Sequence, residues 1–287
     1  MNKYQEALTK FAPIGTNEQV SEEVHKILQI YGQENFTPEI LKFLHGCIDL
    51  TSLSTTDTKE SIWKLVNKVN DFEGIRPDIP NVAAICTFPI FTELVKEALT
   101  AQDVKIAAVA GGFPSAQTFE EVKVAETALS VMHGADEIDT VLNVGFLLEE
   151  NYQELAENIQ EIKESAHGST LKVILETGAL KTTANIQRAA IISIYSGADF
   201  IKTSTGKEYE GATQEAIYTM CQVIKQYYMM TERQIGIKVS GGVKKAEDAV
   251  KYYTIIRHIL GEKWLNKAYF RIGASNLATD LVSQIGE

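Results

Sequence analysis

The sequence predicts an α/β protein built as a single (β/α)8 TIM barrel with an N-terminal helical extension. Eight short apolar runs alternate with eight helix-like segments, no change in composition divides the chain, and turns rich in small residues follow the last three runs. Strands separated by helices pair in parallel through right-handed crossovers, and eight such units can close into a barrel. An open, doubly wound sheet is the alternative.

The first 40 residues are expected to be helical. Apolar residues recur at helical spacing from Glu18 to Ile30, and Gly32 then provides a helix stop. Pro38 suits the first turn of a short helix that leads into the first strand. We therefore divide the chain into a helical extension over residues 1–40 and a barrel domain over residues 41–287.

The barrel strands are expected where short apolar runs lie between turn residues. In order, the runs are Phe43–Leu50, Val82–Phe88, Val104–Ala110, Glu137–Leu142, Leu171–Glu176, Phe200–Thr203, Ile235–Val239 and Tyr269–Ile272. The helices expected after them are Lys59–Val69, Phe91–Leu99, Thr118–His133, Tyr152–Ser165, Thr183–Ser196, Thr213–Tyr228, Ala246–Leu260 and Asn276–Ile285. Thr118, with Glu121 three positions later, matches a capping box.

Composition narrows the classes of function. The 287 residues carry a net charge of −11 without a basic cluster longer than a pair, which argues against nucleic acid as a partner. The N-terminus lacks the apolar core of a signal peptide and no apolar window is long enough to span a membrane, so we expect a cytoplasmic protein. Three distant cysteines and five scattered histidines indicate neither disulfides nor a metal site.

One lysine occupies an unusual position in an apolar strand. Lys202 lies between Phe200 and Ser204 on one face of a run that ends in small residues. Burial disfavours an ammonium, so the pKa of such a lysine falls, and a neutral amine is a nucleophile toward carbonyl groups. Lys238 repeats this pattern one unit later and provides a second cation that would lower the pKa further. The alternative is that both side chains reach solvent from the strand ends.

Further polar residues are expected to point into the barrel. Alternation along the strands gives the set Asp49, Cys86, Asp139, Lys172, Lys202 and Lys238. Buried carboxylates and lysines must pair or become neutral. A purely structural ion network is the alternative to catalysis. We interpret Cys86 as a packing residue, because no histidine is placed to activate its thiol.

The turns after the last three strands suggest a phosphate site. They read Thr205-Gly206-Lys207, Ser240-Gly241-Gly242 and Gly273-Ala274-Ser275-Asn276, and the third leads directly into the last helix. Glycine lets backbone N–H groups approach an anion, and a helix N-terminus favours negative charge. Barrels often bind phosphate in these last loops.

Several segments resemble the deoxyribose-phosphate aldolase family, from near Cys47 to the C-terminus. The main one is Ala198–Gly206, which resembles the family's Schiff-base segment. Supporting segments are Ala83–Cys86, Gly134–Asp139, Leu171–Gly178 and Arg271–Ser275. The resemblance implies a class I, cofactor-free and metal-independent aldolase that cleaves 2-deoxy-D-ribose 5-phosphate reversibly to acetaldehyde and D-glyceraldehyde 3-phosphate.

The resemblance also implies roles for individual residues. Lys202 matches the Schiff-base lysine, Lys238 the lysine that depresses its pKa, and Asp139 the carboxylate of the proton relay. Lys172 and Asp49 match supporting residues. The phosphate-site positions are Thr205, Gly206, Lys207, Gly241, Gly242, Gly273, Ser275 and Asn276, although a second serine is common at the position of Asn276.

Two other functions are compatible with the residues alone. One is a lysine-dependent barrel enzyme that acts on a different sugar phosphate, and the other is a barrel that binds a phosphorylated metabolite without catalysis. The partner expected in each case is a small phosphorylated compound. A homodimer is compatible with these features.

Overall fold

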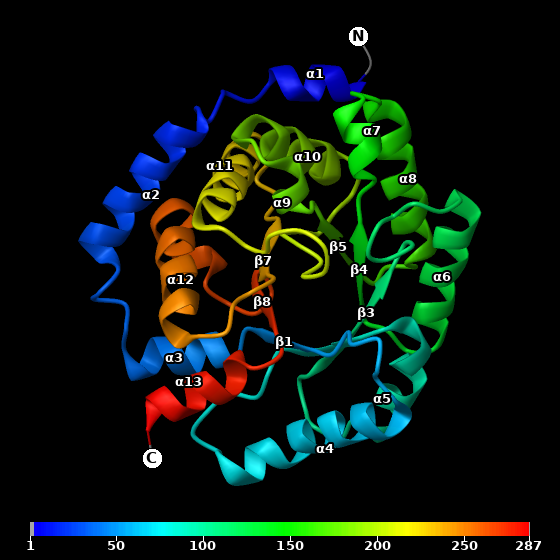
Figure 1. Ribbon diagram of the computed structural model, residues 1–287, viewed down its shortest axis with the longest axis vertical. Helices are drawn as coiled ribbons and strands as arrows, with labels where there is room; N and C mark the ends of the chain where they lie inside the picture. Colours follow the sequence, from blue (N-terminus) through cyan, green and yellow to red (C-terminus); the bar gives the residue numbers. More distant parts are fainter. Residues whose placement is uncertain (1–2, 287) are drawn as a thin grey trace.

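Eight parallel strands close into a barrel in the computed structural model, which describes residues 3–286 (Figure 1). Each strand pairs with its neighbours in sequence order, and the last strand pairs with the first. The strands are β1 (Ile48–Thr51), β2 (Ala84–Thr87), β3 (Lys105–Ala110), β4 (Glu137–Val141), β5 (Thr170–Ile174), β6 (Phe200–Lys202), β7 (Gly236–Ser240) and β8 (Phe270–Ala274). The predicted (β/α)8 barrel is confirmed, and the open-sheet alternative is wrong.

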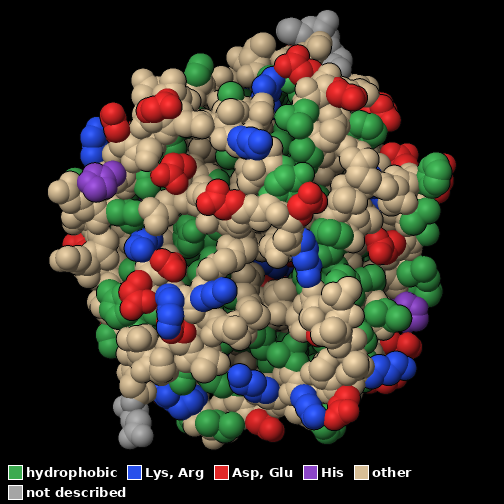
Figure 2. All heavy atoms as spheres, in the orientation of Figure 1, with side chains coloured by type: hydrophobic (Ala, Val, Ile, Leu, Met, Phe, Trp, Pro, Cys, Tyr) green, Lys and Arg blue, Asp and Glu red, His purple; other side chains and the backbone are tan. Residues whose placement is uncertain are grey.

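A layer of helices surrounds the strands, as Figure 1 shows. In the space-filling view of the same face, side chains of both charges are scattered over the surface (Figure 2). The longer ones are α4 (Lys59–Ile75), α5 (Thr92–Ala98), α6 (Glu120–Met132), α8 (Tyr152–Ser165), α10 (Thr183–Tyr195), α11 (Gln214–Thr231), α12 (Ala246–Leu260) and α13 (Leu277–Ile285). Short helical segments not expected from the sequence are η1 (Pro89–Phe91), α7 (Val144–Leu148), α9 (Thr177–Leu180) and η2 (Glu262–Trp264). The core fills the space between strands and helices because most of the longer helices bury an apolar face, as α4 does with Ile62, Val66 and Val69.

Three N-terminal helices cover part of this layer: α1 (Lys3–Thr9), α2 (Asn17–Tyr31) and α3 (Pro38–His45). In Figure 1, α1 and α2 lie along the outside of the barrel, where α1 contacts α8 and α10 and α2 contacts α11 and α12. Asn17 connects the start of α2 to the start of α10: its side-chain oxygen accepts a hydrogen bond from Thr183 N at 2.8 Å. The predicted helix up to Gly32 is confirmed.

Two local predictions are wrong. The run Phe43–Leu50 is not one strand, since its first three residues end α3 and β1 begins at Ile48. A short apolar run does not distinguish a helix from a strand, and the Thr37 cap together with Pro38 favours the helix. The capping box at Thr118 does not form either, because α6 begins at Glu120 and no side chain caps it.

Candidate active site

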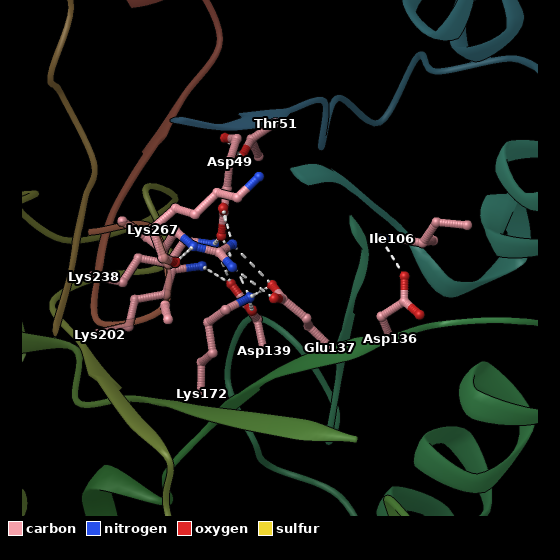
Figure 3. A network of polar contacts seen from close by, with 12 residues as sticks. Asp49, Thr51, Ile106, Asp136, Glu137, Asp139, Lys172, Lys202, Lys238 and Lys267 are labelled. Carbon is pink, nitrogen blue, oxygen red and sulfur yellow. Dashed lines mark hydrogen bonds and ion pairs between the residues drawn. The ribbon is translucent and has the colours of Figure 1, made fainter. Parts of the chain in front are cut away.

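The register of the barrel brings the predicted polar residues together inside it. Lys202 is level with Lys238 across β6 and β7, and Lys238 is level with Arg271 across β7 and β8. On the other side, Asp139 of β4 is level with Lys172 of β5. The side chains of Asp49, Asp139, Lys172, Lys202 and Lys238 point toward one another, as Figure 3 shows.

Asp139 is at the centre of these contacts. Its Oδ1 accepts a hydrogen bond from Lys172 Nζ at 2.9 Å, and its Oδ2 accepts hydrogen bonds from Lys202 and Lys238 at 2.7 Å each. Asp49 pairs with Lys238 at 2.5 Å and lies 3.4 Å from Lys172. The alternative of lysines that reach solvent is wrong for this structure, since Lys202 is 2% exposed and Lys238 is fully buried.

Two further charged residues complete the group. Arg271 donates to Asp49 Oδ1 at 2.7 Å and to Glu137 Oε1 at 2.8 Å, and Lys172 pairs with Glu137 Oε2 at 2.6 Å. Neither residue was in the expected site, although Glu137 lies two positions before Asp139 on the same strand face. We call Asp49, Glu137, Asp139, Lys172, Lys202, Lys238 and Arg271 the charged cluster.

The charged cluster has one more cation than it has carboxylates. Three carboxylates face three lysines and one arginine, so loss of one proton would balance their charges. Burial lowers the pKa of Lys202 and the charge of Lys238 lowers it further, against the effect of Asp139. For Lys172 and Lys238, burial is outweighed by neighbouring carboxylates, and their pKa is raised. Lys202 is therefore the lysine that releases a proton most readily.

Asp49 and Asp139 stay ionised in this surrounding. Burial would raise the pKa of each carboxyl, but the neighbouring cations outweigh it and hold both pKa values below the ordinary range of an aspartate. A carboxylate that accepts hydrogen bonds from three lysines keeps its charge because the ionised form is the one that those donors stabilise. The cluster thus combines a fixed carboxylate with an amine that is easily made neutral.

The predicted phosphate loops lie beyond the strand ends at the same side of the barrel. Gly206, Gly241 and Gly242 have φ values of 74°, 91° and 82°, in the left-handed region that favours glycine. No side chain caps α13 at Asn276, so the first N–H groups of this helix are free of a capping side chain. Ser275 is exposed beside them.

The other predicted phosphate residues have contacts within the protein. Lys207 extends to Leu53 after β1, where its amine donates to the carbonyl oxygen, and it lies 5.8 Å from the ring centre of Phe88. Thr205 bonds to Glu176. Gly273 leaves room for Lys238, because an added Cβ would lie 3.1 Å from Lys238 Cε.

A cavity of about 290 Å³ opens on this side, between the loops that follow β3, β4, β5 and β6. Its lining includes Val141, Glu176, Thr205 and Tyr209. A larger cleft of about 600 Å³ lies at the opposite end of the barrel, near Cys47. Because active sites of such barrels lie at the C-terminal ends of the strands, we assign function to the former side.

Cysteine and histidine residues provide no competing site in the described part of the chain. Cys86 is buried among Ala84, Ala107 and Val109, and burial raises the pKa of its thiol. His45 is stacked on Phe72 at 4.6 Å. Residues 3–286 contain no group of three His, Cys, Asp or Glu side chains arranged to hold a metal ion. Over the same residues, no helix has the length and apolar character needed to cross a membrane.

Comparison with known proteins gives consistent matches. Residues 46–256 match the family model described as DeoC/LacD family aldolase. Deoxyribose-phosphate aldolase of Bos taurus is 36% identical over 251 residues, which are 83% of this chain and 78% of that protein. A Caenorhabditis elegans protein, provisionally given the same name, is 38% identical over 92% of this chain and 87% of its own length. The tetrameric deoxyribose-phosphate aldolase of Aeropyrum pernix is 26% identical with a TM-score of 0.68, over 90% of this chain and 95% of that one.

Proposed function

The chain belongs to the DeoC/LacD family of aldolases, and we propose that it cleaves 2-deoxy-D-ribose 5-phosphate reversibly to acetaldehyde and D-glyceraldehyde 3-phosphate. The observation that carries this proposal is the position of Lys202. It is the cluster lysine whose pKa is lowered, it is held at 2.7 Å from a carboxylate, and it ends β6 at the side of the barrel where the loops can bind substrate.

The reaction would begin with an imine. Neutral Lys202 attacks the aldehyde carbon C1 of the open-chain sugar, and loss of water gives a protonated imine. This imine is an electron sink: the C3 hydroxyl loses its proton, the C2–C3 bond breaks, and D-glyceraldehyde 3-phosphate leaves. The electron pair stays on the remaining fragment as an enamine. Protonation at C2 and hydrolysis then release acetaldehyde and restore the Lys202 amine.

The residues around Lys202 would hold and move the protons. Asp139 bonds to Lys202 and Lys172 through different oxygens, so it can pass a proton between bound water and the reacting carbons with Lys172 as its partner. Lys238 shares Asp139 Oδ2 with Lys202 and favours the neutral form of that amine by charge repulsion. Asp49 holds Lys238 in place.

The phosphate group would be bound by the loops after β6, β7 and β8. We assign it to Thr205, Gly206, Lys207, Gly241, Gly242, Gly273, Ser275 and Asn276. The positive φ values of the glycines and the absence of a capping side chain on α13 support this assignment, because both features expose backbone N–H groups. Lys207 would supply a positive charge once its amine leaves Leu53.

The test is an assay of both products from 2-deoxy-D-ribose 5-phosphate. Acetaldehyde is followed with alcohol dehydrogenase and NADH, and D-glyceraldehyde 3-phosphate with its own dehydrogenase. Equal amounts of the two products support the proposal. Cleavage of other sugar phosphates alone would indicate a different lysine-dependent aldolase, and binding without either product would indicate a non-catalytic barrel.

The remaining proposals concern the whole molecule. We propose that residues 1–40 form an extension of a catalytic domain over residues 41–287, that the protein acts in the cytoplasm, and that it forms a homodimer. Contacts of α1 and α2 with the outer helices support the first of these. Light scattering coupled to gel filtration measures the assembly, and a monomer or a tetramer would contradict the dimer.

A further inference from the structure

Glu176 is a buried carboxylate outside the charged cluster. The predicted strand Leu171–Glu176 ends early, at Ile174, and Glu176 adopts left-handed backbone angles (φ 56°, ψ 58°) at the start of α9. Strict alternation along that strand would place its side chain on the same face as Lys172, but the carboxylate contacts Thr205. Glu176 is 4% exposed, and no hydrogen bond joins it to the charged cluster within residues 3–286.

Glu176 instead binds the start of the loop after β6. Its carboxylate accepts hydrogen bonds from Thr205 Oγ1 at 2.6 Å and from Thr205 N at 3.2 Å. Thr205 Oγ1 in turn accepts a hydrogen bond from Lys207 N at 3.2 Å. A chain of hydrogen bonds thus runs from the buried end of β5 to the exposed backbone of Lys207, across the turn that contains Gly206.

The backbone of Glu176 indicates that its side chain is needed there. Left-handed angles are unfavourable for a glutamate, whereas glycine and asparagine adopt them more readily. A residue held in such a conformation requires support from its surroundings, and these conformations often occur at functional sites. Here the two hydrogen bonds that Thr205 donates to the side chain add to the backbone hydrogen bonds of the turn, such as that from Thr177 N to Thr203 O.

We propose that Glu176 is a positioning residue that holds the loop 205–207 in the shape that accepts the phosphate group of the substrate. This inference rests on the proposed function. Because Thr205 N donates to Glu176 and Lys207 N donates to Thr205 Oγ1, the backbone amide left for an anion in the loop 205–207 is that of Gly206. Glu176 also lines the 290 Å³ cavity beside Thr205, on the side of the barrel where the predicted phosphate loops lie.

The test compares the wild-type protein with Glu176→Asn. Asparagine accepts left-handed angles but is too short to reach Thr205, so the variant should keep the backbone turn and remain folded at the assay temperature. We expect its KM for 2-deoxy-D-ribose 5-phosphate to rise roughly tenfold with kcat within about twofold, because a charge-assisted contact that shapes phosphate binding is lost. Cleavage of unphosphorylated 2-deoxyribose should change less than about twofold.

Two further variants separate a positioning role from charge and packing. Glu161→Gln removes an exposed negative charge from α8, outside the loop 205–207, and should leave KM for the phosphorylated sugar unchanged. Thr205→Val removes the hydroxyl that Glu176 binds, and combining it with Glu176→Asn should raise KM little more than one substitution alone.

The possible results are distinguishable. A wild-type protein that does not cleave the phosphorylated sugar overturns the proposed function. If the wild type does cleave it, an unchanged KM in Glu176→Asn overturns the role of Glu176, and so does an equal loss with both sugars. Independent, multiplying effects of the Glu176 and Thr205 substitutions would also overturn it.

Discussion

Replacement of Lys238 by leucine should leave Lys202 protonated and remove most activity at neutral pH. Three carboxylates would then face Lys172, Arg271 and Lys202, so the charges balance only if Lys202 keeps its proton. Because Lys202 and Lys238 both lie 2.7 Å from Asp139 Oδ2, their nitrogens are about 5 Å apart or less, and unit charges at that distance repel by about 3 kcal/mol at an effective dielectric constant of about 20. Loss of this repulsion would reduce the neutral fraction of Lys202 by about two orders of magnitude.

The assay is the dependence of kcat/KM on pH between about pH 5 and 10, where the acid limb reports the nucleophile of the free enzyme. In Lys238→Leu this limb should move to higher pH. The matched control is Lys225→Leu, which removes an exposed lysine from α11 and should leave the profile unchanged. Circular dichroism must show a folded variant, since loss of one partner of a buried ion pair destabilises a protein by about 3–5 kcal/mol.

A chemical rescue makes the test stricter. Position 238 is as buried as the native Cys47, Cys86 and Cys221, so Lys238→Cys is made in a variant with these three replaced by alanine and is alkylated with bromoethylamine while unfolded. After refolding, it carries an amine at nearly the position of the lost one and should regain both activity and the original profile. A folded Lys238→Leu variant with an unshifted acid limb would refute the role given to Lys238.

Further predictions concern other parts of the cluster and its surroundings. Lys202→Arg keeps the charge but cannot form an imine, so acetaldehyde release should fall at least about a thousandfold, and substantial turnover would contradict this. Asp139→Asn should lower the free energy of unfolding in urea by about 3–5 kcal/mol at neutral pH. Because the pKa of Asp139 is depressed, the stability that its carboxylate contributes is present above about pH 4 and is lost as the pH falls further. The free energies of unfolding of wild type and Asp139→Asn should therefore converge in acid. A difference that stays constant with pH would contradict this prediction. Cys86→Ala should keep the rate of acetaldehyde release within about threefold of wild type, because the thiol only fills space in the core. Dialysis against EDTA should leave the rate unchanged, and a loss that Zn²⁺ or Mg²⁺ restores would indicate a metal.

The sequence predicts the fold and the main cluster because both depend on regular alternation. A strand of a parallel barrel directs every second residue inward, so Lys202, Lys238 and Asp139 could be placed on the interior face without coordinates. The eightfold alternation of strands and helices likewise follows from local periodicity. Where periodicity is weak, as at Phe43–His45, the prediction is wrong, because a short apolar run suits either a helix or a strand.

The partners of these residues could not be predicted from local patterns. Arg271 and Asp49 are 222 positions apart and meet only because β8 closes against β1. The left-handed turn at Glu176 ends the alternation of β5 two residues early and redirects that carboxylate to Thr205. Both features depend on the register and closure of the barrel, which no single segment specifies.

The central claim is that Lys202 forms an imine with the substrate. The most direct measurement is mass spectrometry with peptide mapping after incubation with acetaldehyde and sodium borohydride, which reduces an imine to a stable ethyl adduct. We expect one adduct, on Lys202, and none at this position in Lys202→Arg. A folded protein that gains no adduct, or that gains it on Lys172 or Lys238 instead, would contradict the claim.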